Sequence, residues 1–432
     1  MAMVVKNNMS AISTLNTLNK NSSALSKSLQ KVSSGMKINS AADDASGYAI
    51  SERMRVQIRG LDQANQNTQN GTSMMKVAEG AVSSTVDILK TLKEKVINAA
   101  NDTNTDADRA TIQKELDQSI DQINDNANVT YNGKYLVDGS KNAATGGTST
   151  ALTNESLYSS VDWSSKFTDL KDRNGNSLNI TSTDTVTMSW VKEGVTCTAS
   201  VKADKKLSDL IGGTNPAKDM ITFKKGSLIG KDMAGDKVTT ADGGQALTIQ
   251  AKATGVASQI SGLTFSVTNT KGQVQKSANA VLDNFTESIR AQNKSSDNAI
   301  SLQVGTKANQ SIKVGLTDMR AEALGLQSST GKTIQIGTQK QANAAVNVLD
   351  NAVQKALDQQ TTIGAVQSRL SYTSSNLTTA SENVQSSEST IRDADMAKEM
   401  TEYTKNNVLL QAAQSMLAQA NQSSSSVLSL LQ

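Results

Sequence analysis

Two seven-residue repeats of equal length lie near opposite ends of the chain. The first carries an apolar residue every seven positions from Met54 to Val96, with Thr68 as its one polar member. The second runs with the same spacing from Leu349 to Ile391. Apolar residues at this spacing are typical of long helices that pack along one another. Two equal repeats far apart in the sequence therefore predict a mainly α-helical fold, in which long helices from both chain ends pair antiparallel in one bundle or coiled coil.

Composition favours the same architecture. Aromatic residues make up only 3% of the chain, which leaves little material for one large globular core. Pro216 is the only proline, so both ends can run as uninterrupted helices. The residues that we expect along the seam of this bundle are Met54, Leu61, Met75, Val82, Leu89, Val96, Leu349, Ile363, Leu370, Leu377 and Val384.

The stretch from Val32 to Met54, VSSGMKINSAADDASGYAISERM, separates the first repeat from an earlier one that is out of phase with it. Gly35 weakens a helix, and Asn39 or Ser40 is expected to cap a new helix whose first turn carries two aspartates. On spacing alone, this stretch is a break between two helices. A matching slip in phase follows Ile391, so we expect the two breaks to lie beside each other.

The two terminal segments, 4–36 and about 394–431, each carry a single apolar stripe. A helix with one apolar stripe must bury it against a partner, and alone in water each segment should be largely unfolded. We expect neither segment to have an adequate partner inside one chain, so both should be poorly ordered in the monomer. The residues that we expect to drive association are Leu15, Leu18, Leu25, Leu29, Val32, Met396, Tyr403, Leu410, Leu417, Leu428 and Leu431.

The middle of the chain differs in composition, because all four Phe and both Trp lie between Ser140 and Asn298. Alternating apolar residues over 186–201, interrupted by Lys192-Glu193-Gly194, predict a β-hairpin in which Cys197 is buried. This part therefore reads as an inserted, mainly-β domain. The other elements that we expect are strands at 179–181, 248–249 and 263–267, helices over 109–128 and 278–291, an Asn-Gly turn at 132–133, and a hairpin that starts at Ile300.

The sequence offers no catalytic or metal-binding constellation. Histidine is absent and Cys197 is the only cysteine, which removes His-based acid–base chemistry, Cys–His nucleophiles and Cys/His zinc sites. The GKT at 331–333 lacks the glycine spacing of a phosphate loop, so we interpret it as a linker. Asp172, Asn174 and Asn176 lack the rest of a calcium loop and read as a turn. We expect no catalytic residue, no cofactor and no metal.

Charge and hydropathy exclude further classes. The net charge is only +3 and both signs are interspersed, which argues against a nucleic-acid footprint. The start of the chain, MAMVVKNNMSAIS, lacks the apolar region of a secretory signal peptide. A run of about 18 apolar residues is also missing, so we expect no membrane insertion.

Three segments resemble bacterial flagellins. Residues 32–47, VSSGMKINSAADDASG, are similar to the family signature LSSGxRINSAxDDAAG, with Val32 and Lys37 as departures. ESTIRDADMA resembles the family's ARSRIEDADYA, and the end, LAQANQSSSSVLSLLQ, resembles LAQANQxxxxVLSLLR with Gln432 in place of arginine. The resemblance covers about 1–139 and 299–432.

This resemblance implies a structural, non-enzymatic subunit that polymerises into the extracellular flagellar filament and serves motility. It further implies type III export, a chaperone on the C-terminal helix, and junction and cap proteins as partners. The domains expected are 1–43 and 391–432 (the two parts of a filament-core helical domain), 44–139 and 299–390 (the two parts of a bundle domain with a small β-hairpin), and 140–298 (an inserted, variable, mainly-β surface domain). Two alternatives stay open: a hook–filament junction component, and an enzyme or binding module in 140–298.

The resemblance also points to a host receptor, Toll-like receptor 5, as a partner. The family's contact region corresponds here to a stretch in which Thr91 replaces an arginine and Lys95 replaces a leucine, while Glu115 matches. Loss of a planar arginine at an interface is not conservative, so we expect weakened signalling. The residues of this expected contact region are Leu89, Thr91, Glu94, Lys95 and Glu115.

Overall fold

The computed structural model of the chain describes residues 8–211, 220–241 and 243–429, without the side chains of 423–429. Contacts divide the chain into two compact units. The first comprises residues 1–68, 303–310 and 372–432, and the second comprises 69–302 and 311–371. The chain is mainly helical with a central β-rich part, as the seven-residue repeats and the change in composition predict.

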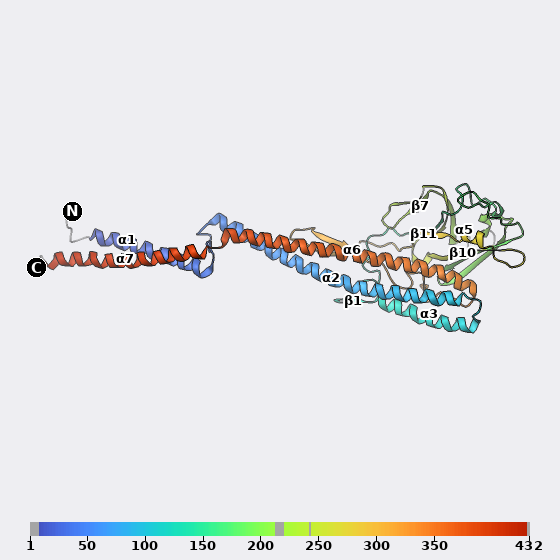
Figure 1. Cartoon of the computed structure of the whole chain (residues 1–432), viewed down its shortest axis with the longest axis horizontal. Coiled ribbons are helices and arrows are strands. Elements are labelled where there is room, and N and C mark those ends of the chain that lie inside the picture. Colours follow the sequence, from blue (N-terminus) through green and yellow to red (C-terminus); the bar gives the residue numbers. More distant parts are fainter. Residues whose placement is uncertain (1–7, 212–219, 242, 430–432) are drawn as a thin grey trace. The chain divides into compact units, whose positions relative to one another are not determined.

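The first unit is built from helices. Helix α1 (Met9–Ser34) and helix α7 (Met396–Ser429) lie side by side (Figure 1). Their hydrogen bonds run in antiparallel order: Asn8 Nδ2 donates to the Ala420 carbonyl at 3.1 Å, and Asn406 Nδ2 donates to Ser28 Oγ at 3.0 Å. Each terminal stripe therefore has a partner within the chain, which corrects the expectation of two unpartnered arms.

Helix α2 (Ala45–Ala99) and helix α6 (Gln339–Arg392) carry the two repeats and contribute to both units. In the first unit, Ser374 Oγ donates to Asn65 Oδ1 at 2.7 Å. In the second, Gln367 Nε2 donates to Glu79 Oε2 at 2.7 Å, and Lys93 pairs with Asp350. The helices are antiparallel in each unit. All the expected seam residues are buried except two that are half-buried, Met54 and Val384.

Helix α3 (Asp106–Ala127) begins three residues earlier than its apolar pattern predicts. The reason is a reciprocal capping box, in which Thr105 Oγ1 accepts the Asp108 N–H and Asp108 Oδ2 accepts the Thr105 N–H. Arg109 is buried and donates from Nε to the Ala99 carbonyl, at 2.9 Å, at the end of α2. This arginine ties the end of one helix to the start of the next.

Two larger sheets form the β-rich part of the second unit. The three-stranded sheet has the order β10 (Ile260–Thr268), β4 (Thr185–Lys192), β5 (Val195–Lys202). The four-stranded sheet has the order β11 (Phe285–Ile289), β3 (Ala151–Asn154), β9 (Ala246–Ala251), β6 (Ile221–Gly226). A cluster that includes Trp190, Phe167 and Met188 forms their apolar core.

Short elements complete this part. Three further strand pairs are two-stranded: β1 (Thr130–Tyr131) with β2 (Lys134–Tyr135), β7 (Leu228–Lys231) with β8 (Lys237–Thr239), and β12 (Ile300–Gln303) with β13 (Ser311–Val314). Within the described ranges, the short helices are η1 (Phe167–Asp169), η2 (Leu207–Leu210), η3 (Val256–Ser258) and α5 (Lys276–Leu282).

Both turns expected from sequence are present. Asn132-Gly133 and Glu193-Gly194 all have positive φ, between 49° and 73°, which is the geometry of a two-residue hairpin. The strands expected around 248–249 and 263–267 and the hairpin at Ile300 are confirmed by β9, β10 and the β12–β13 pair.

Three expectations about the β-rich part are wrong. Residues 179–181 form no strand, and Asn179 has a φ of 53° that interrupts the extended backbone. The helix expected over 278–291 ends at Leu282, because the following residues pair with β3 as strand β11. Cys197 is half-buried rather than buried, since it belongs to the edge strand β5.

Candidate functional site

The two helix breaks lie beside each other, as the matching phase slips predict. Helix α1 ends at Gly35, whose φ of 70° is strained for any residue with a side chain. Backbone hydrogen bonds then join the breaks: Lys37 N–H donates to the Arg392 carbonyl at 2.8 Å, and Ala394 N–H donates to the Gly35 carbonyl at 2.9 Å. Met36 and Asp393 form the bridge between them.

The buried side chain of Arg392 connects the two helix breaks. Its side chain is 7% exposed; Nη1 donates to Glu52 Oε1 at 2.6 Å, and Nε lies 3.1 Å from the sulfur of Met36. The guanidinium also lies over the ring of Tyr48, 5.5 Å from its centroid. The hydrogen bond from Arg392 lowers the pKa of Glu52 below its ordinary value. The spacing of apolar residues did not point to Arg392, because that pattern locates the break only by where the apolar residues change phase.

The aspartates of the break do not have the expected positions. We expected them in the first turn of a helix capped by Asn39 or Ser40, but α2 begins only at Ala45. Asp44 Oδ1 accepts the N–H groups of Ser46 and Gly47 and caps α2 itself. Asp43 accepts the N–H groups of Asn39 and Ser40, and these bonds lower its pKa.

An apolar surface remains on the paired helices α1 and α7. The expected stripe divides in two: Leu18, Leu25, Val32, Tyr403, Leu410 and Leu417 are half-buried, whereas Leu15, Leu29 and Met396 are exposed. The side chain of Leu428 and the whole of Leu431 lie outside the described residues. Together with other positions of the two helices, the large apolar residues that are between 42% and 70% exposed are Met9, Ile12, Leu15, Leu29, Met396, Met400, Val408, Leu409 and Met416.

The expected receptor-contact residues are largely engaged within the chain. Lys95 Nζ lies 3.0 Å from Glu115 Oε1, which joins α2 to α3. Thr91 Oγ1 donates to the Asp87 carbonyl one turn earlier, at 3.0 Å. Leu89 is fully buried in the seam, while Glu94 is exposed. The substitution of lysine for leucine at position 95 therefore gives Glu115 an intramolecular partner.

The two segments that weakly resemble ligand-binding motifs, 172–176 and the GKT at 331–333, both belong to hairpin turns of the same kind. Asp172 Oδ1 accepts the N–H groups of Asn174 and Asn176, while Gly175 has a φ of 89°. The expectation that the GKT segment is a linker is wrong, because residues 328–332 form a structured turn of this kind. The same five-residue turn, with Asp, Asn or Ser at its start and glycine in fourth place, occurs at 232–236, 269–273 and 328–332.

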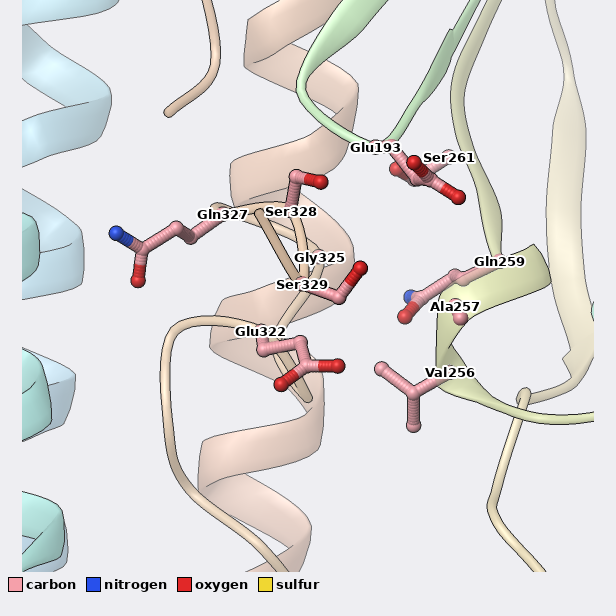
Figure 2. A pocket seen from close by; sticks show the side chains of 10 residues that line it. All are labelled: Glu193, Val256, Ala257, Gln259, Ser261, Glu322, Gly325, Gln327, Ser328 and Ser329. Carbon is pink, nitrogen blue, oxygen red and sulfur yellow. The ribbon is translucent and has the colours of Figure 1, made fainter. Parts of the chain in front are cut away.

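A small cavity of about 10 Å³ lies beside the last of these turns. Gln259, Glu322 and Ser329 point toward it (Figure 2). Gln259 Oε1 has no hydrogen-bond partner among the described residues. A cavity of this volume has room for about one water molecule.

In the described part of the chain, no group of three or more acidic or cysteine side chains converges as a metal site. None of its helices is both long and apolar enough to cross a membrane.

Fold and surface together describe a structural protein in which both chain ends pair as helices and a β-rich part is inserted between them. The family models of the bacterial flagellin N-terminal and C-terminal helical regions match residues 5–142 and 346–431. Flagellin of Clostridium tyrobutyricum is 36% identical over 97% of this chain and 99% of its own length. Flagellin of Bacillus subtilis is 30% identical over 99% of this chain and 100% of its own length.

Among solved structures, flagellar hook associated protein-3 of Legionella pneumophila has a TM-score of 0.34 at 15% identity, with 78% of this chain and 97% of that chain covered. A score this low does not bear on the fold. The sequence matches do decide the family: the chain belongs to the bacterial flagellins. It is accordingly a structural subunit of the extracellular flagellar filament, which serves motility.

Proposed function

We propose that the α1–α7 pair drives polymerisation through the nine exposed apolar residues named above, which we call the assembly face. The observation that carries this proposal is the exposure of these large apolar side chains on a two-helix pair. Exposed apolar patches of this kind mark protein–protein contacts, since burying them releases about 25 cal/mol per Å². Contacts that repeat without closing on themselves generate a helical filament.

The rest of the chain takes complementary roles in this proposal. Residues 1–43 and 391–432 form the filament core, and 44–139 and 299–390 form a bundle that contacts neighbours. Exposed Val56 and Tyr372 support such contacts, at 68% and 73% exposure. Residues 140–298 project outward and decide surface chemistry, and the chain has no catalytic activity. Further partners are the export apparatus, a chaperone on the C-terminal helix, and junction and cap proteins.

The test of the assembly model is removal of Ala394–Gln432, which deletes α7 and five of the nine residues of the assembly face. We expect no filaments from the truncated protein in electron micrographs, while the full chain elongates seeds indefinitely. Normal filaments from the truncation would overturn the model. A full chain that only caps seeds would favour the alternative, a hook–filament junction component.

Toll-like receptor 5 is a proposed partner with weakened signalling. The support is that Lys95 forms an ion pair with Glu115 within the chain and that Thr91 provides no guanidinium group. We expect the double variant Thr91→Arg and Lys95→Leu to signal at least tenfold more strongly in a receptor reporter assay. Lys90→Leu, an exposed lysine one position from Thr91, is the matched control. Equal signalling by wild type and double variant would refute this explanation.

A further inference from the structure

Charged and polar side chains are buried where strand β11 meets helix α6, within the second unit. Glu287 of β11 has a side chain that is 6% exposed. Lys355 and Gln359 of α6 are 8% and 3% exposed. Buried charges are normally paired and hydrogen-bonded, because removing them from water costs several kcal/mol each. The cost of burying these groups therefore depends on how completely they are paired and hydrogen-bonded.

Pairing in this cluster is incomplete. Glu287 Oε2 lies 3.8 Å from Arg290 Nε, beyond hydrogen-bond distance, and Arg290 makes its close pair with Asp358 at 2.6 Å. Among the described residues, Glu287 Oε1 and Gln359 Nε2 have no hydrogen-bond partner. Lys355 Nζ donates to the Ala323 carbonyl at 2.7 Å and not to a carboxylate.

Burial shifts the pKa values of both buried charged groups toward the neutral range. Burial raises the pKa of Glu287 to about 7, although Arg290 and Lys355 oppose the rise. Burial lowers the pKa of Lys355 to about 8, opposed by Asp318 and Glu287 and assisted by Arg290. Asp318, on the loop before α6, is itself paired with Arg320 at 2.6 Å.

We propose that this cluster, Glu287, Arg290, Lys355, Asp358 and Gln359, makes the attachment of β11 to α6 depend on pH, with its weakest point near neutrality. Between pH 7 and 8 both buried groups are charged, and neither makes a hydrogen bond to a group of opposite charge. The inference concerns the single chain and does not depend on filament assembly.

The direction follows from proton binding. Glu287 binds its proton more tightly in the folded chain than in the unfolded chain, so stability rises as the pH falls through 7 toward 4.5. Lys355 loses its proton more easily when folded, so stability rises as the pH increases from 8 toward 10.5. The two contributions together give a minimum between pH 7 and 8.

Asp283 adds a second acidic titration in the same segment. Its Oδ1 accepts the Phe265 N–H at 2.7 Å, and desolvation raises its pKa to about 6. Stability gained below pH 6 therefore includes this group. Asp283→Asn isolates the contribution of Glu287, because an asparagine oxygen can still accept the same hydrogen bond.

The experiment measures thermal unfolding of the full-length monomer by tryptophan fluorescence between pH 5 and 9. Both tryptophans lie in the β-rich part, so the signal reports this part and not the helical arms. In Asp283→Asn we expect the midpoint to rise by on the order of 5 °C from pH 7.5 to pH 5.5. Adding Glu287→Gln should remove that rise and raise the midpoint at pH 7.5.

Two controls complete the design. Glu382→Gln, at an exposed carboxylate of α6, should leave the profile unchanged. Lys355→Met should remove the rise above pH 8 and keep the acidic one. A flat profile in Asp283→Asn would overturn the proposal. A rise of the same size after Glu287→Gln would also overturn it. If the double variant does not fold, Glu287→Gln alone decides: the rise between pH 7.5 and 6.5 should disappear, and the rise that remains at lower pH should be only that of Asp283.

Discussion

Gly262 illustrates how a single residue permits a strand to approach a helix. It has a φ of 61° and lies within the register shift of β10 between Ser261 and Thr264. A Cβ at this position would lie 2.4 Å from the Ala344 carbonyl oxygen of α6. The next residue's carbonyl, that of Leu263, accepts a hydrogen bond from Asn347. The bulge and the missing side chain together allow β10 to pack on α6.

We therefore expect Gly262→Ala to lower the free energy of unfolding of the β-rich part by about 2–4 kcal/mol. Both the left-handed backbone and the contact with a backbone oxygen oppose a side chain. The measurement is chemical unfolding followed by tryptophan fluorescence. Gly272→Ala is the matched control, because its φ is 77° but no atom lies within 4 Å of the added Cβ. Equal losses in both variants would show that backbone strain alone matters.

At the scale of elements, ends of helices are decided by side chains outside the apolar pattern. The spacing of apolar residues placed the start of α3 at 109, whereas Thr105 and Asp108 start it at Asp106. The hydrogen bonds from Thr105 also lower the pKa of Asp108. The capping sequence was visible, but apolar periodicity does not register a cap that precedes the first apolar residue.

Removing this cap should cost about 1 kcal/mol. Thr105→Ala leaves the N–H of Asp108 without its side-chain acceptor, so we expect faster hydrogen exchange in the first turn of α3. Thr111→Ala is the control, since its hydroxyl bonds only to the Ala107 carbonyl inside the helix. Thr111→Ala should cost nothing measurable, and an equal loss in the two variants would contradict the role of the cap.

At the scale of the molecule, the pairing of α1 with α7 separates two kinds of apolar residue. One kind is half-buried within a single chain, and the other, the assembly face, stays exposed there and is available to other copies in the assembly that we propose. The sequence pattern placed Leu15, Leu29 and Met396 in one stripe with the half-buried residues and did not include the other members of the assembly face. Their division is visible only when the two chain ends are brought together, because the periodicity of one helix does not reveal which side its partner occupies.

We expect the double variant Val408→Ser and Leu409→Ser to raise the critical concentration for filament formation at least tenfold. The two side chains are 59% and 42% exposed in the monomer, and losing their burial removes more than about 1.4 kcal/mol per subunit contact. Seeded elongation followed by sedimentation measures the effect. Thr404→Ser, a polar exposed position of α7, is the control. An unchanged critical concentration with an intact monomer would exclude these residues from the interface.

The sequence by itself determined the long helices, their antiparallel pairing, the paired breaks and the two-residue hairpins at Asn132-Gly133 and Glu193-Gly194. These features depend on residue spacing or on local backbone preferences. Tertiary structure alone decided the strand order β11-β3-β9-β6, the early end of α5, the contacts of Arg392 at the two helix breaks and the burial of Glu287 against α6. Each of these depends on contacts between residues far apart in the chain, whose distances no local pattern records.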